Sequence, residues 1–390
     1  MNTYALLETP QQIYYGRGSF KKMGDLVKDK GTKVLLISDK TMEQLGYIEK
    51  SVQQLDERGL TYAIYLGVDS EPNDDYVREA LAVYKKNHCD VIVSIGGGSC
   101  IDTAKAVAVL ATNGGDISDY MNNHKNVINK PTAHVAIPTT AGTGSEATDV
   151  TVITNVANKE KMMIKQFGFL PDAAIVDPLL TLSAPKRVTA ATGVDALSHA
   201  IEAYISKLSH PMTDMLALSA IKLIANNLLT VYEQGNNIEA REKLSLGSLQ
   251  AGMAFGNASV CLVHGLSRPI GALFHVPHGF SNAMLLPAVL EFSKDACIDR
   301  LADVGRMFTN KTLSNEEAAD FAVSFIKQLC AKLHIPNLKE WGIDEETFER
   351  NIPKMAEDAI RSGSPANNPR VPTIEEIKKL YTTCFHYQFE

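Results

Sequence analysis

Four side chains in the second half of this 390-residue chain have the types and the spacing of metal ligands. Asp195 and His199 are four residues apart, so a helix would place both side chains on one face. His264 is followed fourteen residues later by His278, and Gly279 comes directly after it. One carboxylate and three imidazoles are enough to surround a divalent transition metal ion. We therefore expect a metal centre formed by Asp195, His199, His264 and His278.

Each of these residues also has an ordinary structural alternative. Asp195 and His199 could form a hydrogen-bonded pair within a helix, and the other two histidines could be partly buried residues with satisfied nitrogens. The neighbouring sequence favours ligation, because residues 190–197 place a carboxylate among small apolar side chains. A buried carboxylate is costly unless it is paired or bound to a metal. Nitrogen and oxygen ligands without a thiolate favour Fe²⁺, with Zn²⁺ as the alternative.

The elements that must position these ligands are helices. After about Leu182 the strand patterns nearly vanish, and the spacing of apolar residues predicts helices over 188–205, 214–229, 238–255 and 315–333. Thr373 and Glu376 have the spacing of a capping box and predict the start of a last helix. Two X-Pro pairs, 177–178 and 184–185, break local structure. We therefore expect an α/β domain over 1–184 and an all-helical metal-binding, catalytic domain over 185–390.

The first half alternates apolar strands with amphipathic helices. Runs over 33–39, 91–95 and 134–138 read as strands, and 75–87 reads as a helix between two of them. Continuous apolar strands with helical crossovers indicate a parallel sheet that is covered on both faces. The first half is therefore predicted to be a dinucleotide-binding α/β domain.

Two loops of this half could hold a phosphate group. Gly96-Gly97-Gly98-Ser99 follows a strand and opens a helix over 100–110, where glycines allow close backbone approach and Ser99 could cap the helix. Thr139–Ser145 supplies hydroxyls and flexible backbone at the end of another strand. Glycine triplets also occur in plain turns, but ligands of open α/β sheets bind at these strand ends. The two loops together suggest that a pyrophosphate binds between them.

Asp39 ends an earlier strand and could accept hydrogen bonds from ribose hydroxyls. A carboxylate at this place would repel the 2′-phosphate of NADP, so NAD is favoured over NADP. The plain alternative is a surface turn residue.

Composition limits the other classes of function. A formal net charge of -7 without a basic tract argues against nucleic acid as a partner. No run of eighteen apolar residues predicts a membrane span, and the first residues lack the pattern of a signal peptide. The six cysteines are scattered without CxxC spacing, which is typical of reduced core thiols. These features predict a cytoplasmic protein.

Several motifs taken together resemble the iron-containing (group III) alcohol dehydrogenases of the dehydroquinate synthase-like superfamily. They are Gly96–Ser99 with Asp102 and Lys105, Pro138–Glu146, Gly193–Glu202, and the stretch from Met253 through His264 to Gly279. The resemblance covers nearly the whole chain, including Asn368-Pro369-Arg370. It implies a cleft between the domains, a homo-oligomer, and the metal ligands named above. It also implies NAD(P) contacts at Asp39, Gly97, Gly98, Ser99, Asp102, Thr139, Thr140, Thr143, Thr148, Lys161, Leu180 and Thr181.

The chain departs from this family at one position. Many members carry a further histidine, a candidate proton relay, four residues after the third ligand, and this chain has Arg268 there. Arginine is no base near neutral pH. Arg268 could pair with an acidic neighbour such as Glu202 and hold the site together, which we favour, or it could bind an anionic group of the substrate. His275 is a substitute relay or a supporting residue.

The expected metal ligands, the nucleotide-binding loops and the family resemblance together predict a metal-dependent oxidoreductase. It would interconvert a small primary alcohol and its aldehyde with NAD(H). Phe255, Arg268 and His275 are the expected substrate-binding residues. Alternatives are a zinc-dependent glycerol dehydrogenase-like enzyme or other hydroxy-compound dehydrogenase, a dehydroquinate synthase relative, and an aldehyde reductase for an anionic short-chain substrate. A metal-dependent hydrolase or lyase, or a non-catalytic nucleotide sensor, would be a different class.

Overall fold

The computed structural model describes residues 4–389 and divides the chain into two compact units. One unit spans Glu8–Ala184 and contains the strands. The other takes in Pro185–Glu390, with the residues ahead of Glu8 counted with it, and is helical. The prediction of an α/β half with a parallel sheet, followed by an all-helical half, is confirmed. Residues 1–3, which belong to the stretch without a signal-peptide pattern, lie outside the described part.

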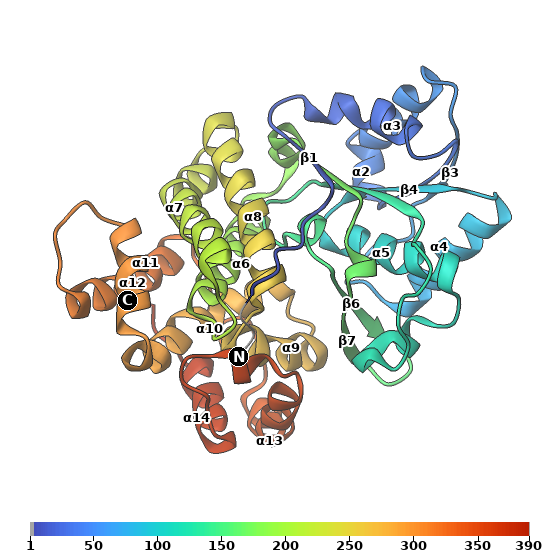
Figure 1. Ribbon diagram of the computed structural model, residues 1–390. Coiled ribbons are helices and arrows are strands. Elements are labelled where there is room, and N and C mark those ends of the chain that lie inside the picture. Colours follow the sequence, from blue (N-terminus) through green and yellow to red (C-terminus); the bar gives the residue numbers. More distant parts are fainter. Residues whose placement is uncertain (1–3, 390) are drawn as a thin grey trace. The chain divides into compact units, whose positions relative to one another are not determined.

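The first unit is built on a six-stranded sheet in the order β1-β8-β5-β4-β2-β3, in which every pair of neighbours is parallel (Figure 1). A separate antiparallel hairpin, β6–β7, follows the fifth strand. The strands are β1 (Gln12–Tyr15), β2 (Lys33–Ile37), β3 (Thr61–Tyr65), β4 (Val91–Gly96), β5 (Ala133–Pro138), β6 (Val150–Asn155), β7 (Glu160–Lys165) and β8 (Ala173–Val176). The helices are α1 (Met23–Lys28), α2 (Lys40–Gln44), α3 (Tyr47–Asp56), α4 (Asp74–Lys86) and α5 (Gly98–Asn113).

Both faces of this sheet are covered, as continuous apolar strands require. Alternate residues of β2 point to opposite sides: Val34 and Leu36 belong to one buried cluster, and Leu35 and Ile37 belong to the other. The first cluster packs against α1 and α3, and the second against α4 and α5. Because all strands are parallel, their carboxyl ends meet at one edge, and loops from this edge are fixed by a rigid core.

The sheet changes its winding direction between β2 and β4. The chain leaves β2 towards β3 on one side and leaves β4 towards β5 on the other. Open α/β sheets bind their ligands at such a point, outside the carboxyl ends of the strands. Asp39 follows β2 and Gly97 follows β4, so these two predicted cofactor residues flank the change of direction.

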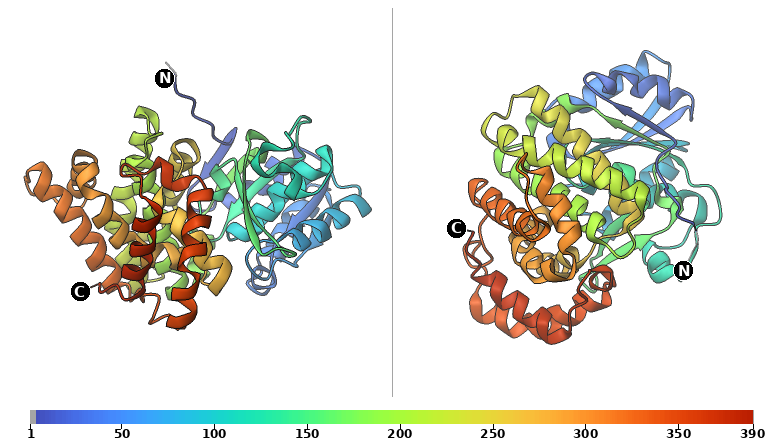
Figure 2. Two further views of the ribbon diagram at one scale, coloured as in Figure 1. Left: turned by 90° about the horizontal axis from the view of Figure 1, so that it is seen from below. Right: turned by 60° about the vertical axis from the view of Figure 1, so that its left-hand side comes forward.

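The second unit is a set of packed helices (Figures 1 and 2). It contains α6 (Lys186–Ile205), α7 (Pro211–Glu233), α8 (Ile238–Ala258), α9 (Leu262–Phe274), α10 (His278–Ser293), α11 (Ile298–Met307), α12 (Asn315–Lys332), α13 (Glu345–Arg361) and α14 (Ile374–Phe385). The predicted capping box is present, since Thr373 and Glu376 each accept a hydrogen bond from the other's backbone N–H. In Figure 2, α13 and α14 lie side by side at one end of this unit.

Among the described residues, α7 is the one helix that is by itself long and apolar enough to cross a membrane. The helices α8 and α9 pass the same test only as a pair, which is bent by 101°. One face of α7 is buried, through residues such as Ala217, Ile221 and Leu228, and the helix packs against α6 and α8. We therefore interpret α7 as a core helix of this unit.

Candidate metal centre and nucleotide edge

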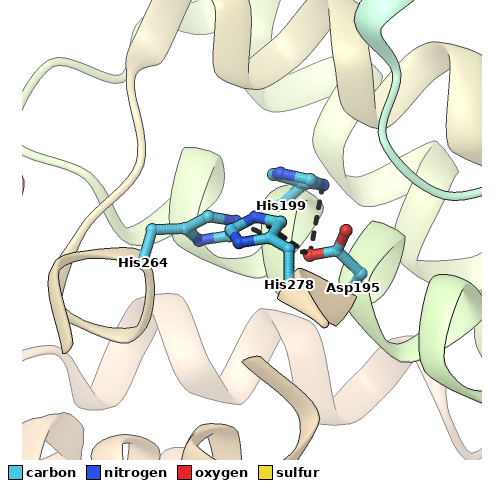
Figure 3. Close-up of side chains that lie close together, drawn as sticks. All are labelled: Asp195, His199, His264 and His278. Carbon is cyan, nitrogen blue, oxygen red and sulfur yellow. Dashed lines mark ion pairs between the residues drawn. The ribbon is translucent and has the colours of Figure 1, made fainter. Parts of the chain in front are cut away.

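The four predicted ligands meet in the helical unit (Figure 3). One ligand atom of each residue lies within 4.8 Å of those of the other three. Oδ1 of Asp195 lies 3.9 Å from Nδ1 of His199, 3.7 Å from Nε2 of His264 and 3.9 Å from Nε2 of His278. Residues that are up to 83 positions apart (278 − 195) are thus brought together by three helices, α6, α9 and α10.

The local sequence explains how each ligand reaches the cluster. Asp195 and His199 lie one turn apart in the buried middle of α6, as their spacing predicted. His264 is in the first turn of α9, and His278 is the first residue of α10. Between these helices, His275 adopts a left-handed conformation with φ of 53°, which ends α9 and allows the chain to turn into α10.

The tautomer of His264 is fixed by a buried carboxylate. Glu202 on α6 is 1% exposed; one of its oxygens lies 2.6 Å from Nδ1 of His264, and the other accepts a hydrogen bond from the backbone N–H of Val263 at 2.6 Å. Because Nδ1 donates its proton to Glu202, the lone pair of Nε2 points into the cluster. Pairs of carboxylate and histidine commonly orient metal ligands in this way.

The electrostatics of the cluster fit a cation. Burial opposes ionisation of Asp195, but the three neighbouring histidines outweigh it and lower the pKa of Asp195. Burial lowers the pKa of His199 to about 3, so its imidazole is neutral at physiological pH. Nδ1 of this buried ring has no hydrogen-bond partner among the described residues. An ionised carboxylate, a neutral imidazole with an unpaired nitrogen and the fixed ring of His264 are suitable ligands for Fe²⁺ or Zn²⁺.

The three predicted substrate-binding residues lie at different places. The ring of Phe255, on α8, stacks on the ring of His199 with centroids 4.1 Å apart. Arg268 is half-buried, one turn after His264 on α9. Burial lowers the pKa of Arg268 to about 10, and the charge of the Glu202 carboxylate counteracts this. The interaction supports the interpretation that Arg268 pairs with Glu202 and holds the site together. His275 is exposed at the end of α9.

In the α/β unit, Asp39 and the two predicted phosphate loops converge at the carboxyl edge of the sheet. Oδ1 of Asp39 accepts a hydrogen bond from the backbone N–H of Met42 and caps α2, and Oδ2 lies 3.6 Å from Sγ of Cys100 beside the glycine turn. A Cβ at Gly98 would meet Cγ2 of Thr143 at 2.8 Å, so the two loops touch where glycine leaves room. This proximity is the arrangement expected for loops that share a pyrophosphate.

The predicted cap of the phosphate helix is wrong in one detail. The residue that caps α5 is Gly97, and Ser99 lies inside the first turn. The helix begins two residues earlier than predicted because Gly98 already has helical geometry. The first turn therefore presents backbone N–H groups of the glycine turn itself, with no side-chain cap hydrogen bond in competition.

The predicted cofactor residues divide into two groups by exposure. Asp39, Gly97, Gly98, Ser99, Thr140, Thr143 and Lys161 are partly exposed, and Lys161 pairs with Glu71. Asp102, Thr139, Thr148, Leu180 and Thr181 are buried.

Asp102 belongs to a buried polar network. Its carboxylate accepts hydrogen bonds from the Ser145 hydroxyl and, at 2.9 Å, from the backbone N–H of Val152. Lys105, which is 1% exposed, donates to Oγ1 of Thr148 and to the carbonyl of Val150. The network joins α5 to the threonine loop and to β6. A cofactor contact of Asp102 or Thr148 stays a prediction.

Glu146, directly after the Thr139–Ser145 loop, is a titratable group that should make the free energy of unfolding depend on pH. Burial raises the pKa of Glu146 from 4.5 to about 7. As pH rises through this interval, the unfolded chain loses the proton first, so stability falls with rising pH. We expect Glu146→Gln to be more stable than the wild type at pH 8, by roughly 3 kcal/mol at most, and the difference should shrink towards pH 5.

Denaturant unfolding midpoints of both proteins at pH 5 and pH 8 would measure this effect. The exposed Glu49→Gln is the matched control and should give the same difference at both pH values. A difference for Glu146→Gln that grows as the pH is lowered would contradict the assignment.

Two residues of the metal centre were not found as such from the sequence. The sequence indicated Glu202 only as a partner of Arg268, and the structure adds its contact with Nδ1 of His264. Asn282, one turn after His278 on α10, lies with its amide nitrogen against three of the four ligands. The four-residue spacing from His278 could have indicated that Asn282 shares the ligand face.

Comparison with known proteins agrees with this geometry. Residues 10–178 match the family described as iron-containing alcohol dehydrogenase, and 189–385 match the C-terminal part of the Fe-containing alcohol dehydrogenase family. The chain is 38% identical over 376 residues to the NAD-dependent methanol dehydrogenase of Bacillus methanolicus, covering 95% of this chain and 97% of that protein. It is 35% identical over 385 residues to the NADPH-dependent butanol dehydrogenase of Clostridium saccharobutylicum, with 98% of each covered.

A crystal structure of 1,3-propanediol oxidoreductase superposes with a TM-score of 0.94 at 38% identity, covering 98% of this chain and all of that one. Sequence identity at this level over nearly the full length, with both halves of the chain matched, establishes the relationship. The chain belongs to the iron-containing alcohol dehydrogenase family.

Proposed function

We propose that the protein is an alcohol dehydrogenase that interconverts a small primary alcohol and its aldehyde with NAD(H), and that its metal is Fe²⁺, with Zn²⁺ as the alternative. The observation that carries this proposal is the cluster of one carboxylate and three imidazoles, three of the four residues buried, in which Glu202 fixes a ligand ring. The methanol, butanol and propanediol enzymes to which the chain is similar support a short-chain alcohol as substrate.

Different side chains of the chain would hold the metal ion, orient a ligand and contact the substrate. Asp195, His199, His264 and His278 would hold the ion, and Glu202 keeps His264 oriented while the substrate exchanges. A divalent ion held there would act as a Lewis acid on the substrate oxygen, while NAD would accept the hydride. Phe255 covers one face of His199 and offers an apolar surface to a small carbon chain. In this proposal Arg268 braces Glu202, and His275 has a supporting role.

The cofactor would bind at the carboxyl edge of the sheet. The N–H groups at the start of α5 and the hydroxyls of Thr140 and Thr143 suit a pyrophosphate. Asp39 would accept hydrogen bonds from the ribose of the adenosine half and would repel a 2′-phosphate.

Asp39→Gly is expected to change the choice of cofactor. The wild type should prefer NADH to NADPH, and removing the carboxylate should shift the ratio of kcat/KM values towards NADPH by roughly tenfold to a hundredfold, since one lost charge repulsion is of the order of 1–3 kcal/mol. The measurement is aldehyde reduction with each cofactor in turn. A wild type that prefers NADPH would contradict the role given to Asp39.

The function itself is tested on the full chain reconstituted with Fe²⁺ under anaerobic conditions. NADH formation from NAD is followed with a panel of primary alcohols, and NADH consumption with the matching aldehydes. Activity that is lost on chelation and restored by Fe²⁺ or Zn²⁺ supports the proposal. Stoichiometric metal binding without any alcohol-dependent reduction of either cofactor would overturn it.

The cellular setting is also a proposal. We infer that the enzyme works in the cytoplasm, as its composition and cysteine pattern predict, and that it is a homo-oligomer, as the family resemblance implies. Its six cysteines are all free thiols, which supports a reducing compartment.

A further inference from the structure

Asn282 lies at the centre of the ligand cluster. It is 0% exposed, and its amide nitrogen lies 2.6 Å from Oδ1 of Asp195, 3.0 Å from Nε2 of His264 and 3.1 Å from Nε2 of His278. The atom that faces the carboxylate at 2.6 Å must be a donor, so the NH₂ group and not the carbonyl points into the cluster. The amide oxygen is buried and has no hydrogen-bond partner in the described part of the chain.

These contacts compete with metal binding at two of the three atoms. An imidazole nitrogen has one lone pair, which either accepts a hydrogen bond or binds a metal. In His264 the nitrogen that faces Asn282, Nε2, is also the one that must bind the metal, because the other ring nitrogen is held by Glu202. Asp195 is different, since a carboxylate oxygen can bind a metal and still accept an N–H.

The spacing of the ligand atoms agrees with this competition. Ligands about 2.1 Å from an ion in tetrahedral geometry are about 3.4 Å from one another. Oδ1 of Asp195 is 3.7 Å from the His264 nitrogen and 3.9 Å from the His278 nitrogen. These two distances are a few tenths of an ångström longer than in a loaded tetrahedral site, and the Asn282 nitrogen lies within 3.1 Å of all three atoms.

We propose that Asn282 is a placeholder for the cation: in the metal-free protein its NH₂ group donates one hydrogen to Asp195 and shares the other between His264 and His278, and it gives up the histidine contacts when the ion binds. The inference rests on the proposed metal centre. Asn282 keeps the cluster assembled without metal, and it lowers metal affinity because part of its bonding is lost on loading. It is a positioning residue that acts through Asp195, His264 and His278.

The test is the dissociation constant for Zn²⁺, measured on the full chain by competition with a chromogenic chelator. Asn282→Ala removes about one hydrogen bond more from the metal-free form than from the loaded form. The variant should therefore bind Zn²⁺ roughly five- to thirtyfold more tightly than the wild type. Its thermal midpoint should fall in both forms, and it should fall further in the metal-free form than in the loaded form.

Asn368→Ala is the matched control. Asn368 is also 0% exposed, its amide nitrogen has two hydrogen-bond partners, and its amide oxygen also has no partner among the described residues. It bonds to Ser293 and Arg370, away from the ligands. This variant should lose stability equally in both forms and keep the wild-type dissociation constant.

An unchanged or weaker dissociation constant for Asn282→Ala overturns the placeholder role. If the variant does not fold without metal, crystal structures of the metal-free and Zn²⁺-loaded wild type decide the question. The Asn282 nitrogen should contact both histidines in the first and only Asp195 in the second, and contacts that are identical in both overturn the inference. A wild type that fails to bind Zn²⁺ would instead refute the metal centre itself.

Discussion

Replacing Asp195 with alanine is expected to lower kcat/KM by roughly a thousandfold or more. Asp195 is the only carboxylate among the four ligands, and its Oδ1 lies within 3.9 Å of all three histidines. Its loss leaves three imidazoles that carry no charge to neutralise a divalent ion. Lewis-acid stabilisation contributes several kcal/mol to the transition state, and each 1.36 kcal/mol changes the rate about tenfold.

Metal content and kcat/KM should be measured on the same preparation of the variant. Asp214→Asn is a suitable control, because Asp214 lies in the same unit and pairs with Arg300 away from the cluster. The control should keep both its metal and its activity. An Asp195→Ala variant with wild-type activity and no bound metal would mean that the ion has no part in the reaction.

Glu202→Gln is expected to weaken Zn²⁺ or Fe²⁺ binding by at least tenfold to a hundredfold. Both oxygens of Glu202 accept hydrogen bonds, one from the Val263 N–H and one from His264. Glutamine offers one acceptor and one NH₂ group, so an N–H must face another N–H or His264 must move its proton to Nε2. That proton would occupy the lone pair that the metal needs.

Chelator competition on the full chain measures this effect. Glu291→Gln is the control, since Glu291 accepts a hydrogen bond from the Tyr387 hydroxyl in the same unit and touches no ligand. A dissociation constant for Glu202→Gln within about threefold of the wild type would show that ring orientation does not depend on the carboxylate.

Local patterns predicted the parts of the molecule that depend on near neighbours in the sequence. The apolar stretch around Asp195 predicted α6, which extends only two residues further at its start, and the four-residue spacing predicted that Asp195 and His199 share a face. Strand β4 and the glycine turn after it were recognised because apolar runs and glycines report backbone conformation directly.

Features that depend on distant partners could not be predicted from one sequence. The pairing of β1 with β8 joins segments about 160 residues apart, and nothing within Gln12–Tyr15 indicates its partner. Glu202 is an ordinary helical glutamate until α9 brings His264 to it. Asn282 has the spacing to share a face with His278, but only packing shows that its amide also reaches Asp195 and His264. Such contacts follow from tertiary packing and not from local propensity.

The four ligands differ in how far they are buried, so the cluster has one side that is more open to solvent than the others. The side chains of Asp195, His199 and His264 are 5% exposed or less, whereas His278 is 36% exposed. His278, at the first turn of α10, is therefore the ligand that is most open to solvent. We therefore expect a metal ion to reach and leave the cluster on the side of His278.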